Sequence, residues 1–241
     1  MTERTGRRRR AVALSVGVLL LLGLSVWALT YTPVFRARHI RVTGVDVLTA
    51  EEIRGLGGVD ESTNVVHVDR DAVAGRLETS PWVADASVLV DLPDTLELRI
   101  TERRPIGLID ALGEHGVLAS DASVLPMVRG VPDDLPAVRA ALGAPSELQR
   151  QAAAAILVAI DPVVSKRISA VTVGQDGLVT LTLTSGTTVQ TGAAGDEVAK
   201  AEALRAVLRW ASEGDLELTS IDVSAPTAPS ATLADGSTLT P

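Results

Sequence analysis

Cysteine is absent from this 241-residue sequence, and aromatic residues make up only 2% of it. Without cysteine, the chain forms no disulfide, offers no thiolate nucleophile and holds no cysteine-ligated zinc or iron–sulfur site. The shortage of aromatic rings leaves Leu, Val, Ile and Ala to fill the interior, and a hydrophobic content of 46% is enough for that. At this length the chain accommodates two modest domains beyond any membrane segment.

Motifs of catalysis and cofactor binding are also missing. The sequence contains no HExxH zinc motif, no glycine-rich phosphate loop and no Ser-x-x-Lys motif, and its histidines at 39, 67 and 115 are isolated from one another. We therefore predict no catalytic residue, cofactor, metal or small-molecule substrate, and a protein that is not an enzyme. A carboxylate pair drawn from the 30 acidic residues is the one catalytic arrangement left open, which keeps a cell-wall hydrolase as an alternative.

The charge is distributed unevenly along the chain. The formal net charge is −8, yet the first ten residues carry five arginines and one glutamate, so the remainder is more acidic still. Because nucleic-acid binding requires a basic face for the phosphates, the acidic body excludes nucleic acid as a partner. Lysine occurs only at Lys166 and Lys200, and this preference for Arg, with abundant Ala and Val, indicates a GC-rich genome.

An uncharged run follows the basic N-terminus. Residues Ala11–Leu29 are almost all apolar, and their number is close to the roughly 20 that a membrane-spanning helix needs. We predict a cytoplasmic tail at 1–10, a transmembrane helix at 11–31 and an extracytoplasmic remainder, with the interface residues Arg7, Arg8, Arg9, Arg10, Trp27 and Tyr31. A cleaved signal peptide is the alternative, and it exports residues 36–241 equally.

The segment 36–104 reads as a small α+β unit. Residues 39–44 alternate as a strand does, Thr49 with Glu52 forms a predicted capping box, and Asp69 or Asp71 caps a second helix. Two strand-like segments follow at 83–90 and 95–101, separated by a turn. The predicted order is therefore β-α-α-β-β.

The segment 105–226 reads as a second, mixed β-sheet domain with flanking helices. Helices are predicted after Ser146 and from Asp196 to Gly214, and the hairpin turns fall at 176–177 and 185–186. Leu218–Val223 is predicted as the final strand. Residues 227–241 are rich in Pro, Ala, Ser and Thr without periodicity, so we predict a disordered tail.

Four motifs in the first unit carry a resemblance to a known family. They are Ile40-Arg41-Val42-Thr43-Gly44, Ser80-Pro81-Trp82-Val83-Ala84-Asp85-Ala86, Leu92-Pro93-Asp94-Thr95-Leu96 and Thr101-Glu102-Arg103-Arg104-Pro105. Their order after one N-terminal anchor resembles the FtsQ/DivIB cell-division proteins. The resemblance implies a POTRA domain at 36–104, an FtsQ-type β domain at 105–226, and a plasma-membrane scaffold at the division septum that supports peptidoglycan synthesis. A POTRA-bearing component of polypeptide transport or assembly is the alternative function.

The same resemblance implies partners and contact residues. FtsB/DivIC-like and FtsL-like division proteins are the expected partners, and the family's last strand pairs with the FtsB/DivIC chain at a sheet edge. The candidate partner-binding residues are therefore Leu218, Ser220, Ile221, Asp222, Val223 and Ser224, with Lys200 and Arg205 either solvated or bordering that edge. Glu102, Arg103 and Arg104 are interpreted as a solvated junction or as a charged hinge that orients the two domains, and Trp82 is interpreted as a core anchor.

Overall fold

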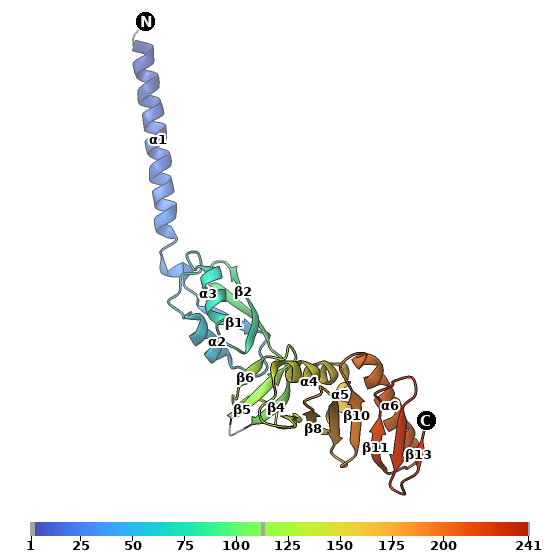
Figure 1. Ribbon diagram of the computed structural model, residues 1–241. Coiled ribbons are helices and arrows are strands. Elements are labelled where there is room, and N and C mark those ends of the chain that lie inside the picture. Colours follow the sequence, from blue (N-terminus) through green and yellow to red (C-terminus); the bar gives the residue numbers. More distant parts are fainter. Residues whose placement is uncertain (1–2, 112–113, 241) are drawn as a thin grey trace. The chain divides into compact units, whose positions relative to one another are not determined.

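The computed structural model describes residues 3–111 and 114–240, without the side chains of residues 3–13, 110, 111 and 114. The chain divides into two compact units, Met1–Glu102 and Arg103–Pro241, each described here by itself (Figure 1). The fold class is mixed α+β, with a small three-stranded sheet in the first unit and a ten-stranded sheet in the second.

The first unit begins with the long helix α1, Glu3–Leu29, followed by the short 3-10 helix η1, Pro33–Phe35. The helix starts within the segment predicted as a tail, so Arg7–Arg10 lie on it, although their side chains are outside the description. Among the described residues, none of the helices combines the length and the hydropathy that crossing a bilayer requires.

The rest of the first unit has the predicted order of elements. They are β1 (His39–Thr43), α2 (Ala50–Gly57), α3 (Arg70–Leu77), β2 (Val83–Asp91) and β3 (Thr95–Glu102). The sheet order is β1-β3-β2, with β1 parallel and β2 antiparallel to the central strand β3. Each outer strand therefore has a side without a strand partner in this unit.

Local sequence signals explain these elements. Thr49 accepts the N–H of Glu52 while the Glu52 carboxylate accepts the N–H of Thr49, which completes the predicted capping box of α2. Asp69 caps α3 by accepting the N–H of Ala72. Trp82 is only 1% exposed, which confirms its interpretation as a core anchor.

The second unit forms one sheet with the strand order β13-β12-β11-β10-β9-β8-β7-β4-β5-β6. Its strands are β4 (Pro105–Ala111), β5 (Glu114–Ala119), β6 (Val124–Pro126), β7 (Ala137–Ala140), β8 (Ile168–Val173), β9 (Val179–Leu183), β10 (Thr188–Gly192), β11 (Leu218–Asp222), β12 (Ser230–Leu233) and β13 (Thr238–Leu239). Its helices are α4 (Glu147–Ala159), α5 (Pro162–Ser165) and α6 (Glu197–Glu213).

Helices α4 and α6 contact each other and provide the apolar cover of the sheet. α4 packs against β4, β5 and β8, and α6 packs against β11. The buried core between them includes Leu157, Val171, Leu181, Leu204 and Ile221. At the start of α4, the hydroxyl of the predicted cap Ser146 accepts the N–H of Gln149. Asp196 occupies the corresponding position before α6 with φ 57°, but its side chain makes no capping hydrogen bond.

Two predictions about the end of the chain are wrong. Residues 230–233 and 238–239 form β12 and β13, so the segment predicted as a disordered tail contains a hairpin. Because β12 pairs with β11, the strand predicted to lie at the edge lies inside the sheet, between β10 and β12.

Candidate functional site

The predicted partner strand β11 is paired with another strand on each side. It pairs in parallel with β10 and antiparallel with β12, with Ile221 opposite both Val189 and Ala231. Beyond its end, the N–H of Val223 donates to the carbonyl of Gln190 at 2.9 Å. Both neighbouring strands use the β11 backbone, so an added strand requires a different edge.

The side chains predicted to contact the partner divide into two groups. Ile221 and Val223 are 1% and 0% exposed and belong to the core. Leu218, Ser220 and Asp222 are half-buried, and Ser224 is exposed. The Asp222 carboxylate accepts the N–H of Ser224 at 2.8 Å and so shapes the loop after β11.

The two cations proposed on α6 differ in their surroundings. Lys200 is 6% exposed, and its ammonium donates to the carbonyl of Ala193, so the interpretation as a solvated charge is wrong. The N–H of Gly195 and, to a smaller extent, the Lys200 charge lower the pKa of Glu197. Lys200 therefore fixes the turn that leads into α6, and only Arg205 remains exposed for a partner.

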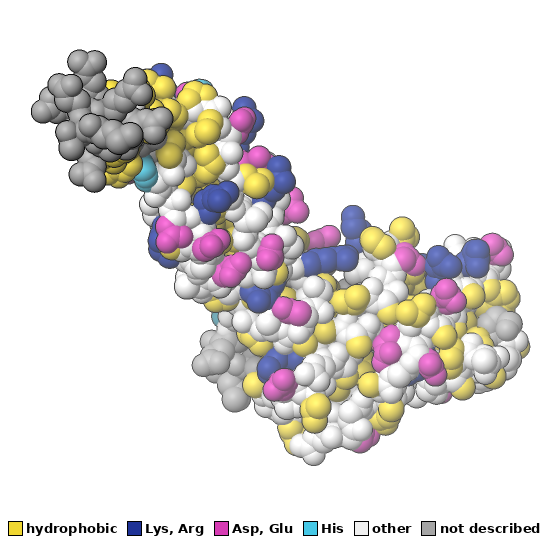
Figure 2. Space-filling model, turned by 90° about the horizontal axis from the view of Figure 1, so that it is seen from above, with side chains coloured by type: hydrophobic (Ala, Val, Ile, Leu, Met, Phe, Trp, Pro, Cys, Tyr) yellow, Lys and Arg dark blue, Asp and Glu magenta, His cyan; other side chains and the backbone are white. Residues whose placement is uncertain are grey.

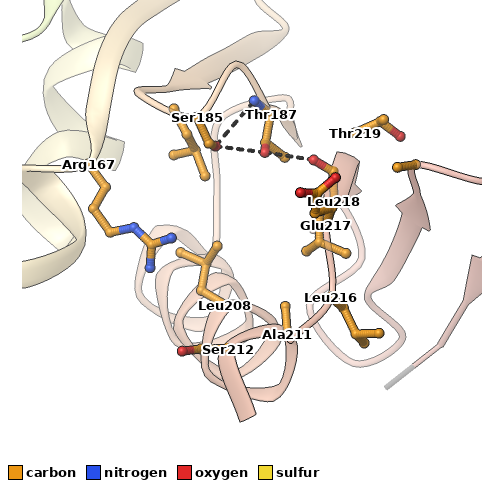
Figure 3. Close-up of a pocket in the computed structure, with 12 residues that line it drawn as sticks. Arg167, Ser185, Thr187, Leu208, Ala211, Ser212, Leu216, Glu217, Leu218 and Thr219 are labelled. Carbon is orange, nitrogen blue, oxygen red and sulfur yellow. Dashed lines mark hydrogen bonds between the residues drawn. The ribbon is translucent and has the colours of Figure 1, made fainter. Parts of the chain in front are cut away.

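A pocket of about 460 Å³ opens beside β11 (Figure 3). Its walls come from the β9–β10 hairpin, the last turns of α6, the residues that enter β11 and the turn after β12. The apolar lining includes Leu183, Leu208, Leu216 and Leu218, and the exposed Arg167 lies on the rim. Glu217 also lines the pocket, so its carboxylate offsets the charge of Arg167, and the leucines suit an apolar group.

Hydrogen bonds hold one wall of this pocket in place. The Thr187 hydroxyl donates to the carbonyl of Leu218 at 2.8 Å and lies 2.8 Å from the Ser185 hydroxyl (Figure 3). These bonds tie the β9–β10 hairpin to the start of β11. No histidine or cysteine is among the residues that line this pocket.

The three junction residues predicted to orient the domains each bind within their own unit. The Glu102 carboxylate accepts the N–H groups of Asp46, Val47 and Leu48 at 3.0, 2.8 and 2.8 Å, which holds the loop before α2. The carbonyl of Arg104 accepts the N–H of Ser120. Glu102 therefore belongs to the bonding of the first unit and Arg104 to that of the second, on either side of the unit boundary.

Arg103 forms an ion pair with Asp121 on the second unit, at 2.8 Å. Partial burial raises the pKa of Asp121, but hydrogen bonds from Ser123 and from Arg103 outweigh it and hold that pKa below its ordinary value of 3.8. Ser123 makes the larger contribution to the lowered pKa and Arg103 the smaller one.

The predicted membrane-interface aromatics lie at the end of α1 and connect it to the rest of the first unit. Tyr31 stacks on the His67 ring with centroids 4.2 Å apart, and Trp27 meets Tyr31 edge to face at 4.9 Å. The Asn64 amide donates to the carbonyl of Thr30 at 2.7 Å. These contacts attach the end of α1 to the loop before α3.

Charges of both signs are interspersed on the face of the molecule shown in Figure 2. This face therefore lacks the continuous basic field that nucleic acid requires.

Within the described ranges, no group of three or more His, Cys, Asp or Glu side chains is arranged to hold a metal ion.

Sequence reasoning missed the features that shape this end of the sheet. Asp235-Gly236, with φ 84° at the glycine, forms the turn between β12 and β13, and such a dipeptide beside the alternating Ala231-Thr232-Leu233 signals a hairpin. Arg167 and Leu216 carry no motif, and only the folded chain brings them to one pocket.

Comparisons with known proteins cover both units. Residues 35–103 match the family described as "POTRA domain, FtsQ-type", and residues 103–224 match "Cell division protein FtsQ/DivIB, C-terminal". "Cell division protein FtsQ" of Streptomyces bingchenggensis is 32% identical over 242 residues, which covers 95% of this chain and 88% of that protein. The FtsQ of Streptomyces venezuelae is 29% identical over 228 residues, covering 91% and 83%. The solved extracytoplasmic domain of DivIB from Geobacillus stearothermophilus aligns with a TM-score of 0.35 and 16% identity, over 48% of this chain and 96% of that one.

Proposed function

The chain belongs to the FtsQ/DivIB family of cell-division proteins, and we propose that it acts in the divisome as a scaffold that binds partner proteins and catalyses no reaction itself. Its role is to support septal peptidoglycan synthesis at the outer face of the plasma membrane. The observation that carries this proposal is the pair of family matches, which join end to end at residue 103 and cover both units. The transport alternative is not favoured, because the second match is specific to division proteins.

We propose that residues 11–31 anchor the chain, with the N-terminus in the cytoplasm. Consecutive leucines of α1, from Leu19 to Leu22, are 57–69% exposed and need an apolar environment. The arginines before them favour the cytoplasmic side by the positive-inside rule. Trp27 and Tyr31 then lie at the level of the outer headgroups, next to the first unit.

The proposed partner is an FtsB/DivIC-like chain that contributes a strand, with an FtsL-like protein in the same complex. Since β11 is internal, the edge proposed for the partner at this end of the sheet is that of β12. There β13 pairs with Ala231 and Thr232, and the turn between the strands holds the N–H of Leu233 through the carbonyl of Ser237. Both β13 residues are exposed, so a longer strand can replace β13 at small cost. The adjacent pocket beside Leu208 and Leu218 would then receive an apolar side chain of the partner.

Depletion in the native host tests the scaffold role. Loss of the protein should block septation and produce elongated cells, and re-expression of the full chain should restore division. Normal septation without detectable protein would refute the proposal. The purified full chain should neither cleave nor crosslink peptidoglycan. An active hydrolase, assayed in parallel, is the positive control.

A truncation tests the proposed edge. The chain ending at Gly236 lacks β13, and we expect it to bind the partner's strand-forming segment at least as tightly as the full chain. A Leu216→Glu variant, which places a charge in the pocket at a half-buried position outside the buried core, should weaken the same binding. If the truncated chain melts normally yet loses all binding, the partner requires β13 and does not replace it.

A further inference from the structure

Strand β1 lies at one edge of the small sheet in the first unit. This strand pairs only with β3, and the N–H of His39 donates to the carbonyl of Asp94 on that side at 3.2 Å. Main-chain groups of successive strand residues point in opposite directions, so those of Ile40 and Val42 point away from β3. Within the described part of the chain, no other strand pairs with β1.

A groove of about 290 Å³ follows this edge. It is lined by the consecutive residues Arg38, His39, Ile40 and Arg41, and closed by Arg54 of α2 and by Glu61. Because the lining includes four residues in a row, the groove runs along the backbone of β1. Its walls hold three arginines against one glutamate, in a chain whose net charge is −8.

The arginines of the groove are available for a ligand. Arg38, Arg41 and Arg54 are all exposed, and the described residues give none of them an ion pair within 4.0 Å. Arg41 lies opposite Glu97 on β3, but that carboxylate already binds Arg99 at 2.7 Å. His39 Nδ1 lies 3.6 Å from the Asp94 carboxylate.

We propose that β1 and this groove bind an extended, acidic polypeptide segment of another protein, which adds as a strand to the edge of the small sheet. A free strand edge presents donors and acceptors in alternation, and only another extended backbone satisfies both. A phosphate or a lipid headgroup can pair with the arginines, but it does not present donors and acceptors at the regular spacing of Ile40 and Val42 along the strand. The arginines select acidic side chains in that strand.

The other edge of the same sheet shows why the charge matters. β2 also pairs only with β3, but it carries the exposed carboxylates Asp85 and Asp91. An acidic strand at β2 meets like charges, which disfavour pairing. The proposal is independent of the partner at β12, since β1 belongs to the first unit and β12 to the second.

Fluorescence polarisation with the full chain in detergent micelles tests the charge requirement. The probe is a labelled peptide of alternating Glu and Val, and the control probe replaces Glu with Lys. The double variant Arg38→Glu, Arg54→Glu should bind the acidic peptide at least about tenfold more weakly, and should gain affinity for the basic peptide. Arg70→Glu, which reverses another exposed arginine of the same unit, should change binding less than about twofold.

Amide hydrogen exchange locates the bound peptide. The acidic peptide should protect the N–H groups of Ile40 and Val42 and leave those of β2 unchanged. Binding that survives the double reversal, with unchanged exchange at Ile40 and Val42, would place the peptide away from β1 and overturn the proposal. Equal binding of the acidic and basic peptides, or no binding of either, would overturn it as well.

Discussion

Removal of the Glu102 carboxylate should loosen the first unit by releasing the loop before α2. The two oxygens accept three main-chain N–H groups at 2.8–3.0 Å, from Asp46, Val47 and Leu48. This loop connects β1 to α2, so it sets where the helix begins on the sheet. Glu102→Ala leaves all three donors without their acceptor, whereas Glu102→Gln keeps one oxygen that can still accept.

The size of the effect follows from these bonds. A hydrogen bond to a charged group contributes about 1.5–3 kcal/mol to stability. The Asp46 N–H is exposed and can bind water instead, which leaves the two part-buried donors of Val47 and Leu48. Two such bonds give about 3–6 kcal/mol, and water entering the loop recovers part of it, so we expect a loss of about 2–4 kcal/mol for Glu102→Ala. Glu102→Gln should lose about half of that.

Trp82 provides the readout for this unit, because its ring is buried in the first core. Replacing the other two tryptophans, Trp27 and Trp210, by Phe makes the fluorescence signal specific to it. Urea unfolding of this background with and without Glu102→Ala gives the change in the free energy of unfolding. Amide exchange of residues 46–48 should accelerate at the same time.

The matched control is Glu97→Ala on the same strand. Glu97 pairs with Arg99 at the surface, and an exposed ion pair contributes little, so this variant should unfold like the parent. If Glu102→Ala unfolds at the parental urea concentration and residues 46–48 exchange at the parental rate, the clamp is energetically unimportant and the reasoning fails.

Three further predictions concern single side chains. Trp82→Ala should cost about 3–5 kcal/mol of unfolding free energy in thermal or urea denaturation, and Trp82→Phe clearly less; equal losses would contradict the packing argument. Lys200→Met should destabilise the second unit by about 1–2 kcal/mol, because the Ala193 carbonyl loses its donor, and an unchanged melting temperature would show that water replaces the ammonium. Asp121 should titrate by NMR below its ordinary 3.8, and Arg103→Ala should raise that pKa. Since the folded pKa is the lower one, the stabilisation by Asp121 is present at neutral pH and is lost as the pH falls below about 4.

Local sequence signals were sufficient to predict the order of the elements from β1 to β3 in the first unit. The capping box at Thr49, the cap at Asp69 and the alternation of 95–101 each depend on residues close in sequence. In the second unit the same kinds of signal found the helix after Ser146 and the hairpin turns. Elements whose stability is decided within one turn or one hairpin can therefore be read from the chain itself.

Predictions failed where contacts between residues far apart in sequence determine the local structure. A lysine is ordinarily expected at the surface. Lys200 is instead buried on α6, and its ammonium donates to the carbonyl of Ala193 in the turn before that helix. The short strands β12 and β13 have weak individual patterns and are stabilised by pairing with β11. The edge was misassigned for the same reason, since the last strong strand pattern in the sequence was not the last strand of the sheet.

The two proposed docking edges obtain specificity from different side chains, although the main-chain pairing is the same. At β12 the neighbouring pocket is lined by Leu183, Leu208, Leu216 and Leu218, so apolar fit must select the partner. At β1 the arginines select by charge, which salt screens. Raising the salt concentration should therefore weaken binding of an acidic strand at β1 and leave the strand at β12 nearly unaffected. A scaffold with one salt-sensitive and one salt-insensitive edge, on separate units, can gain or lose one partner without releasing the other.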